Sequence, residues 1–309
     1  MESLQKSRYT NNRQKPYKQN KRANRERQEK TDEAREKERE PLARPVILSK
    51  QLLLEAGVHF GHKTGDWNPR CFKYLYGIHN NIHVINLSKT LSMWPEVRQR
   101  IIDTVSNGME VLFVGTKRQA SSCIREEALN CGQPYVDKKW KGGTLTNLKT
   151  MRKRVERMNW IEEVLSNPDI SARYVKKELL LLKKEYDKLD ESIGGIRKME
   201  CYPGLVFVVD INKEKTAVEE ARKLGIPVIA LLDSNCDPDK VDYPIPSNDD
   251  AYKSIRLFAS AVSDAVKEAK ELSEQVLEME NKFSDALDDV VEDHFAQLLA
   301  EKEEFSAET

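Results

Sequence analysis

Three short runs of apolar residues, none interrupted by a charge, constrain the fold of this chain more than any other feature. They are VLFV at 111–114, LVFVV at 205–209 and VIALL at 228–232. Val, Ile and Phe are typical of strands, and the latter two runs each lead, within a few residues, into a segment whose apolar residues have helical spacing. Strands without a polar face that alternate with helices predict a parallel sheet covered by helices on both sides.

The remaining periodic segments complete an α/β pattern. We expect a short strand at Tyr135–Val136 and an extended segment at Ile78–Asn86. Helices are predicted at Ser49–Ala56, Ser88–Asn107, Ala120–Asn130, Lys213–Leu224 and Asp249–Glu271.

Residues 145–195 depart from this alternation. Apolar residues recur at spacings of three and four over 148–165 and again over 175–193, and Asn167-Pro168-Asp169 lies between as a turn. This pattern predicts an antiparallel coiled-coil hairpin. Its outer positions are rich in Lys and Arg, which is also what a merely solvated face would show. The predicted domains are a core of residues 46–144 and 196–272 and a hairpin insert of 145–195.

Charge is unevenly distributed, although the formal net charge is zero. Residues 1–30 hold 10 Lys/Arg against 3 Asp/Glu, whereas residues 271–309 hold 13 Asp/Glu against 2 Lys. We expect a basic disordered extension at 1–45, which is too poor in apolar residues to fold, and an acidic tail at 273–309. The predicted fold is therefore α/β, a parallel sheet flanked by helices, with an inserted antiparallel coiled-coil helical hairpin and disordered terminal extensions. A basic arm suggests a polyanionic partner.

Five scattered cysteines without a CxxC pair argue against a disulfide framework or a cysteine-based zinc site and favour a reducing compartment. No apolar run reaches the roughly 20 residues of a membrane span, and the N-terminus lacks the apolar region of a secretory signal. We therefore expect a cytoplasmic protein that has no membrane partner. An organellar location stays open as the alternative.

Two aspartates, Asp210 and Asp233, end predicted core strands, where open α/β sheets carry their function. With the loop at 234–240 they raise the alternative of an α/β enzyme acting on a phosphorylated or nucleotide substrate. They also fit the plain role of turn-formers. The chain has no GxSxG elbow, no GxGxxG after the first core strand and no GxxxxGK[ST] loop. We expect the stretch 224–251 to brace the core or contact a neighbouring protein.

Four histidines, at 59, 62, 79 and 83, superficially suggest a metal site. No cysteine pair or HExxH helix frames them, so loop packing or contact with RNA phosphates is favoured. We expect no metal and no cofactor.

At this point a family resemblance becomes specific. The chain resembles the bacterial-type family of the second protein of the small ribosomal subunit over about residues 50–270. The motifs that carry the resemblance, in chain order, are VHFGH (58–62), WNPR (67–70), IHVINLSKT (82–90), FVGTK (113–117), KKWKGGTLTNLKT (138–150), GGI (194–196), EEARKLGIPVIALLDSNCDPDKVDYPIPSNDDA (219–251) and SIRL (254–257).

The resemblance implies a structural, non-catalytic component of the small ribosomal subunit at its head–body junction. It implies small-subunit rRNA and neighbouring ribosomal proteins as partners, near the messenger exit region, and no small-molecule substrate. Lys141 departs from the family pattern, which usually has an apolar residue there. A coiled-coil adaptor is a further alternative.

The rRNA contacts should come from Lys and Arg, which position a protein on phosphates without reading sequence. The candidates lie in three segments: a predicted loop rich in Gly, His and Asn at 57–70, the turn after the first core strand, and the region leading into the hairpin. They are His59, His62, Lys63, Asn68, Arg70, Lys117, Arg118, Lys138, Lys139, Lys141, Asn147, Lys149, Arg152 and Lys153.

Overall fold

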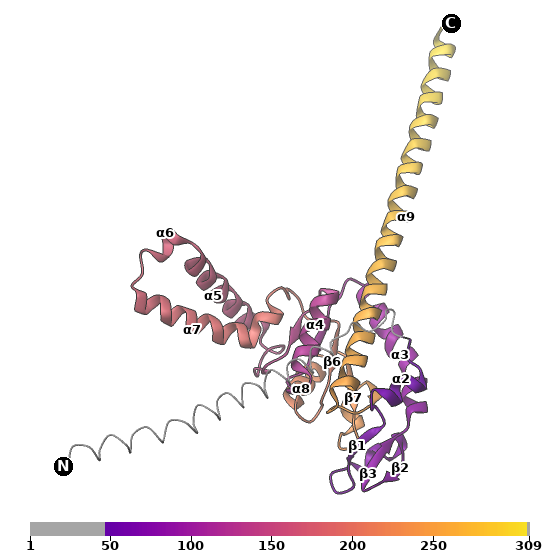
Figure 1. The fold of residues 1–309 in the computed structure, drawn as a ribbon. Helices are drawn as coiled ribbons and strands as arrows, with labels where there is room; N and C mark the ends of the chain where they lie inside the picture. Colours follow the sequence, from indigo (N-terminus) through magenta and orange to yellow (C-terminus); the bar gives the residue numbers. More distant parts are fainter. Residues whose placement is uncertain (1–46, 308–309) are drawn as a thin grey trace, which may run out of the picture. The chain divides into compact units, whose positions relative to one another are not determined.

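A five-stranded parallel sheet forms the centre of the protein (Figure 1). The computed structural model describes residues 47–307, and beyond residue 279 it describes only backbone apart from Lys282. The strand order is β5 (Tyr135–Val136), β4 (Val111–Val114), β6 (Leu205–Val208), β7 (Val228–Leu232) and β8 (Tyr243–Pro246). The predicted parallel sheet is confirmed. The basic extension predicted at 1–45 lies outside the described residues.

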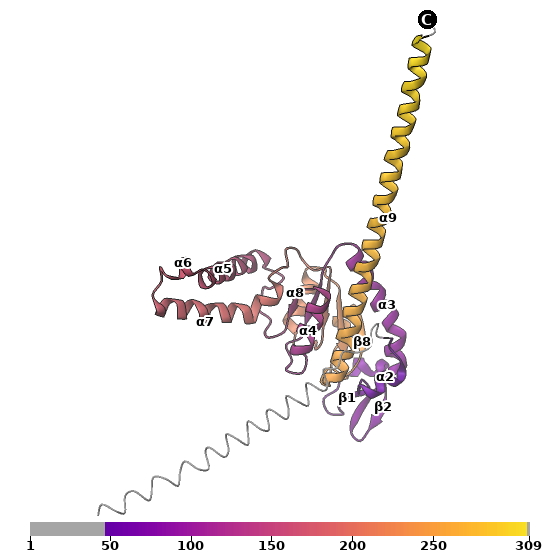
Figure 2. The ribbon, with the colours of Figure 1, turned by 45° about the horizontal axis from the view of Figure 1, so that its top comes forward.

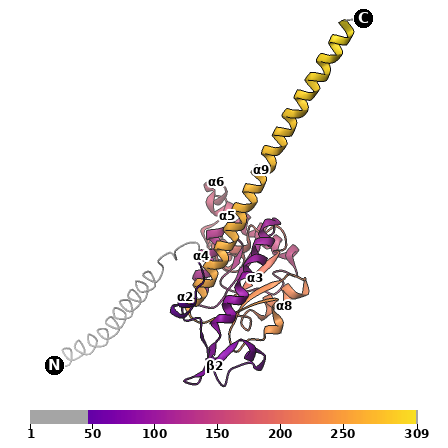
Figure 3. The same cartoon turned by 90° about the vertical axis from the view of Figure 1, so that its right-hand side faces the viewer.

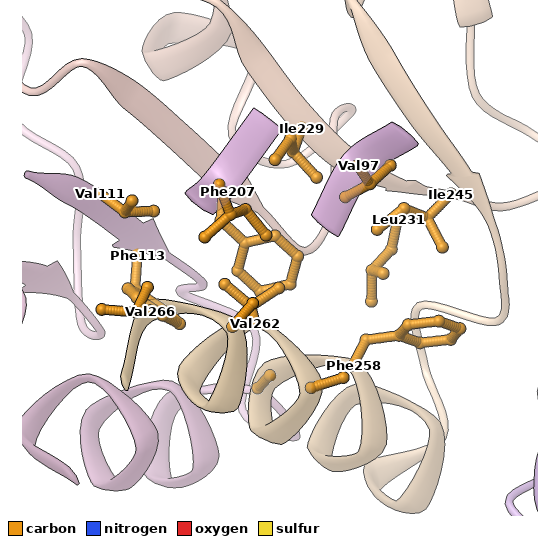
Figure 4. Packing of buried hydrophobic residues seen from close by; sticks show 14 of the residues in the cluster. Val97, Val111, Phe113, Phe207, Ile229, Leu231, Ile245, Phe258, Val262 and Val266 are labelled. Carbon is orange, nitrogen blue, oxygen red and sulfur yellow. The ribbon is translucent and has the colours of Figure 1, made fainter. Parts of the chain in front are cut away.

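Side chains of the central strands alternate between two buried layers, because successive residues of a strand point to opposite faces. Phe113 and Phe207 lie edge to face on one side, with ring centroids 5.7 Å apart. There they pack against Phe258 and Val262 of the last helix, together with the other labelled residues of Figure 4. Leu112, Val114, Val206 and Val208 belong to the second layer on the opposite face. This two-sided burial explains why these strands carry no polar residue.

Helices cover both faces. Those of the first layer are α2 (Lys50–Glu55), α3 (Leu87–Ser106), α4 (Ser121–Cys131) and α9 (Tyr252–Ala307), whereas α8 (Lys215–Lys223) lies against the second. In Figure 3, α3 and α9 run side by side, in agreement with their direct packing. Local signals set the helix ends: Asn86 caps α3, and Gly132 ends α4 with φ 64°.

A second, three-stranded antiparallel sheet precedes α3, with the order β1 (Phe60–Lys63), β3 (Ile82–Ile85) and β2 (Leu75–His79). The segment predicted as one extended piece at Ile78–Asn86 is instead a hairpin. Asn80 and Asn81 turn the chain with positive φ values of 49° and 59°. Asn adopts this conformation more readily than most residues, which is why it suits the turn of a tight hairpin.

The hairpin between β5 and β6 consists of α5 (Leu148–Ser166), the short α6 (Pro168–Ser171) and α7 (Lys176–Ile193). In Figure 2, α5 and α7 lie side by side and α6 connects them at one end. Arg157 pairs with Glu185 across the two helices at 3.0 Å. The two predicted helices are present, and the division of the chain into domains stays a prediction. Short 3₁₀ turns complete the described elements at Pro69–Tyr74, Gly194–Ile196 and Pro238–Lys240.

The last helix is longer than the sequence predicts. Just before it begins, Asn248 Oδ1 accepts hydrogen bonds from the backbone N–H groups of Asp250 and Ala251, which fixes the turn that leads into the helix. The predicted helix ends at Glu271, whereas α9 continues to Ala307 through residues predicted to form a disordered acidic extension. Within the described residues, no helix combines the length and apolar character that crossing a membrane requires.

Candidate functional site

A cluster of charged side chains lies where the carboxyl ends of the central parallel strands meet. Lys117, two residues beyond Gly115 at the end of β4, places its Nζ 2.7 Å from Asp210 Oδ2, 2.8 Å from Asp249 Oδ1 and 2.9 Å from Asp250 Oδ1. The Lys117 side chain is only 11% exposed. Burial alone would lower the pKa of Lys117, but the charge of Asp249 and the bonds to the three carboxylates raise it, so the ammonium group stays charged.

His62 joins this cluster from β1. Its Nδ1 lies 3.0 Å from Asp233 Oδ1, and its Nε2 lies 3.4 Å from Asp250 Oδ2. The hydrogen bond to Asp233 raises the pKa of His62 to about 9, although burial opposes it. The backbone N–H of His62 donates to Ser234 Oγ at 2.8 Å. A Cβ on Gly61 would meet the same Oγ at 2.9 Å, so a glycine is needed for this close approach.

Asp249 is the most deeply buried acid of the cluster, with no exposed surface. Burial and the nearby charge of Asp233 raise the pKa of Asp249 to about 7. Two overlapping groups hold ligand atoms within 4.8 Å of one another: His62, Asp233 and Asp249, and Asp210, Cys236 and Asp249. Carboxylate and imidazole groups are common metal ligands. Among the described residues, these are the ones that could hold a cation. The sequence points to His62, Asp210 and Asp233 separately, but not to their meeting with Asp249 and Cys236.

The acidic loop after β7 is tied to the 3₁₀ turn at Pro69–Tyr74 by further bonds. Arg70 Nη1 lies 3.1 Å from Asp237 Oδ2 and 3.0 Å from Asp239 Oδ2. The buried Cys71 Sγ lies 3.4 Å from the carbonyl oxygen of Asp233 and 3.0 Å from that of Cys236, and donates to them. These contacts join the stretch 224–251 to the 3₁₀ turn, and whether this stretch braces the core or contacts a neighbouring protein stays a prediction.

A second organised region is the loop 138–147, which a single carboxylate holds in place. Glu220 of α8 accepts hydrogen bonds from the backbone N–H groups of Gly143 at 2.8 Å and of Leu145 and Thr146 at 3.0 Å. The indole Nε1 of Trp140 donates to the same carboxylate at 3.2 Å. Burial alone would raise the pKa of Glu220, but these donors outweigh it and lower the pKa. Glu220 therefore remains ionised and fixes the loop.

No sequence motif singles out Glu220. It follows Glu219 on an amphipathic helix, so it looks like any solvated acid. The one local cue is that the KGGT turn leaves backbone N–H groups without acceptors in a helix or strand. This cue does not indicate which side chain accepts their hydrogen bonds. Trp140 uses its indole N–H inside the protein and packs against the second layer of the core.

The predicted contact residues fall into four groups in the structure. His62, Arg70 and Lys117 meet carboxylates in and around the charge cluster. Asn68 and Asn147 act as caps, for the 3₁₀ turn at Pro69–Tyr74 and for α5. His59 and Lys141 are half-buried. The exposed candidates without an ion pair among the described residues are Lys63, Arg118, Lys138, Lys139, Lys149, Arg152 and Lys153.

Comparison with known proteins decides the family. The family model described as ribosomal protein S2 matches residues 53–269. The chain belongs to the ribosomal protein S2 family. It is 48% identical over 227 residues to the small ribosomal subunit protein uS2 of Lawsonia intracellularis, covering 74% of this chain and 78% of the relative. It is 45% identical over 249 residues to the uS2 protein of Helicobacter pylori strain 26695, covering 81% and 94%.

A further relative, the uS2 protein of Agrobacterium fabrum, is 49% identical over 218 residues, 71% of this chain and 85% of the relative. The S2 family consists of structural, non-enzymatic ribosomal proteins, so the enzyme alternative is not supported. The geometry agrees, because Asp210 and Asp233 hold Lys117 and His62. Neither aspartate lines the cavity of about 550 Å³ near β2 or that of about 760 Å³ beside α3. All predicted contact residues lie within the S2 match, whereas residues 271–309 lie beyond it.

Proposed function

We propose that this S2-family protein is a component of the small ribosomal subunit that binds rRNA through a basic surface, defined as Lys138, Lys139, Lys149, Arg152 and Lys153. The observation that carries the proposal is that all five side chains are exposed and have no ion-pair partner among the described residues. They sit on a loop fixed by Glu220 and on the first turns of α5, so a rigid support presents them.

The start of α5 adds a second attraction for phosphate. The first N–H groups of a helix have no intrahelical acceptor, and the helix dipole is positive at this end. Asn147 Oδ1 accepts one of them, from Thr150. The lysines at 138, 139 and 149 flank the same helix end along the chain. A phosphate chain that follows the basic surface would meet charge and backbone donors together.

The other basic candidates have different surroundings. Lys63 and Arg118 are exposed and extend the rRNA contacts beyond the basic surface. His62, Arg70 and Lys117 are held by carboxylates, and an arriving phosphate would have to compete with three aspartates for Lys117. We therefore assign these three residues to bracing the sheet edge rather than to direct phosphate contact.

Neighbouring ribosomal proteins are the second partner class. An apolar surface near β2 is better suited to contact with a protein than to contact with RNA. Phe72, Tyr76 and Ile78 are exposed by 74%, 81% and 62%. They line a cavity of about 550 Å³ together with Trp67 and Leu75. Exposed apolar patches of this kind are typical of protein interfaces.

The rRNA proposal is tested by co-sedimentation of the full chain with small subunits from which the endogenous S2-family protein has been removed. The variant Lys138→Ala/Lys149→Ala/Arg152→Ala should bind more weakly. The slope of log affinity against log salt should fall by roughly 0.7 to 0.9 for each phosphate that the variant no longer neutralises. A matched control, Lys50→Ala/Arg222→Ala/Lys223→Ala, removes three exposed cations elsewhere and should keep the slope of the unchanged protein.

An equal loss of slope in both triple variants would mean that net charge, and not the basic surface, sets the affinity. Unchanged binding by the first variant would overturn the proposal. Thermal unfolding of both variants checks that the fold is intact, since all six side chains are exposed and their removal should cost little stability.

A further inference from the structure

The last helix, α9, has two parts with different surroundings. From Tyr252 to about Lys270 it packs on the sheet between α3 and α4, and Phe258, Val262 and Ala269 are fully buried. Lys270 closes this part, with its Nζ donating to the carbonyl oxygen of Cys131 at 2.7 Å. The helix then continues to Ala307 without a break. We call residues 271–307 the distal helix; in Figure 1 it is the yellow end of α9.

Apolar residues continue along α9 beyond Lys270, where the helix no longer packs on the sheet. Leu272 is 44% exposed, Val276 54%, Leu277 58% and Met279 67%. Beyond them the sequence continues the pattern in steps of 11 residues: Leu272 leads to Phe283, Val276 to Leu287 and Leu298, and Met279 to Val290. Eleven residues make just over three full helical turns, so residues at this spacing lie in a row along one side of a helix.

The row defines one face of the distal helix. At about 100° per residue, its members fall within an arc of about 100°, the width of the buried stripe of an amphipathic helix. We call these positions the apolar stripe: Leu272, Val276, Met279, Phe283, Leu287, Val290 and Leu298. By the same geometry, Glu274, Asp285, Asp288 and Glu292 occupy the opposite side, together with Leu299. Leu277 and Phe295 lie between the two sides, and Glu280 and His294 interrupt the stripe. A stripe of this length on a helix without a packing partner among the described residues indicates a docking face.

The charge of the distal helix selects the partner. Residues 271–309 carry 13 Asp/Glu and 2 Lys, a net charge of −11. Phosphate polymers and anionic membranes are repelled by this charge. A second copy would place −11 against −11, and like charges along a shared seam destabilise paired helices. The complementary occupant carries apolar residues on one side and Lys or Arg on its flanks.

We propose that the distal helix binds a positively charged, amphipathic helical segment of another protein. The apolar stripe would make the contact, and the acidic residues of the distal helix would favour a partner that carries Lys and Arg. Pairing of the two stripes also supplies the tertiary packing that sustains most helices in proteins. This interaction is separate from the basic surface proposed for rRNA, since it uses residues of opposite charge beyond the S2 match.

The experiment uses the full chain and a synthetic probe. The probe is a fluorescent peptide of about 20 residues, long enough for a stable amphipathic helix on a partner, with leucines at helical spacing of three and four and lysines at most other positions. Its isomer with the same composition in scrambled order is the peptide control. Fluorescence anisotropy near physiological salt should show binding of the amphipathic peptide at least tenfold tighter than that of the scrambled isomer.

Two variants separate the stripe from the charge. Val276→Gln/Leu287→Gln/Val290→Gln keeps the net charge and the helix-forming tendency, and should weaken binding of the amphipathic peptide at least tenfold. Asn281→Gln, on the opposite side, should leave it unchanged. Glu274→Gln/Asp285→Asn/Asp288→Asn/Glu292→Gln should weaken binding mainly at low salt. Circular dichroism of each variant confirms that helix content is retained.

Three outcomes would overturn the proposal. One is equal binding of the two peptide isomers, which would reduce the interaction to bulk charge. The second is a stripe variant that binds like the unchanged chain. The third is a stripe-dependent dimer of this chain in sedimentation velocity without peptide, which would make a second copy the occupant.

Discussion

Lys117 Nζ lies 2.7 Å from Asp210 Oδ2 and thereby links the ends of the neighbouring strands β4 and β6. The same ammonium group reaches Asp249 and Asp250 just before α9 begins. One side chain therefore neutralises acids from two distant segments. In an enzyme such groups would be accessible to a substrate, whereas in this cluster the charged side chains are paired with one another.

Removing this charge should destabilise the fold strongly. Lys117→Met leaves Asp210 and Asp249 buried without their cation, and breaking a buried ion pair costs about 3–5 kcal/mol. Equilibrium unfolding in urea would measure the loss. Adding Asp249→Asn should restore part of it, because the neutral amide relieves the repulsion among the remaining carboxylates. The exposed neighbour Arg118→Ala serves as control and should change stability by no more than about 0.5 kcal/mol. Equal effects of Lys117→Met and Arg118→Ala would contradict the assignment.

Glu220→Gln should loosen the loop 138–147 and lower stability at neutral pH by about 1–3 kcal/mol, because the amide keeps one acceptor oxygen and turns an NH₂ group toward backbone donors that have no other partner. The pKa of Glu220 is lowered in the folded protein, so its stabilisation is complete above the ordinary value of 4.5 and is lost as the pH falls through the folded-state pKa. The stability difference between the two proteins should therefore shrink on acidification below pH 4.5.

The exposed Glu219→Gln variant, one residue earlier on α8, is the matched control and should behave like the unchanged chain at every pH. A difference between Glu220→Gln and the unchanged chain that does not shrink as the pH falls below 4.5 would show that the carboxylate charge is not what holds the loop. Amide exchange of Gly143 and Leu145 gives an independent reading of the same contact.

Gly195→Ala should be among the most damaging single-methyl changes in the chain. Its Cβ would lie 2.2 Å from the carbonyl oxygen of Tyr135 and 2.7 Å from a ring carbon of the same residue. Relief requires that β5 and the base of the hairpin separate, at a cost of about 1–3 kcal/mol or more. Gly142→Ala has no atom within 4 Å of its new Cβ and should be neutral or slightly stabilising. Thermal unfolding of the two variants tests the contrast.

Thiol chemistry should distinguish one cysteine from the other four. Cys201 is exposed, whereas Cys71, Cys123, Cys131 and Cys236 are buried. Burial raises the pKa of Cys71 to about 12 and that of Cys131 to about 11, and it raises the pKa values of Cys123 and Cys236 as well. Ellman's reagent at neutral pH should therefore react rapidly with one thiol in the folded chain and with all five in denaturant. Cys201→Ser should abolish the rapid phase.

The central sheet could be predicted because its strands are buried on both faces. The stretch from Val111 to Val114 is apolar throughout. In a surface helix, four consecutive residues would point to all sides, and some of these apolar side chains would face solvent. The sheet of β1, β3 and β2 carries no such signal, since Gly, His and Asn interrupt its strands. Its one local cue is Asn80-Asn81 between Ile78 and Ile82, a pair suited to a tight turn.

The candidate site was harder to predict for a physical reason. Sequence indicates which residues are charged but not which charges meet, because ion pairs here join segments far apart in the chain. Lys117, taken as a phosphate contact, lies 132 residues from its partner Asp249. Lysines of the basic surface were assigned on the same grounds, and they differ only in having no ion-pair partner among the described residues. Tertiary structure decides which flexible side chains stay exposed, and it also decides the acceptor role of Glu220.

The position of Asp249 in the chain also sets an order of events during synthesis. Lys117 emerges from the ribosome long before the acid that encloses it, and the residues of α9 that cover the sheet emerge later still. Until then the first layer lacks the cover that α9 provides, although α2, α3 and α4 of the same layer have already been made. The first layer of the core can therefore be completed only when almost the whole S2 match has been made.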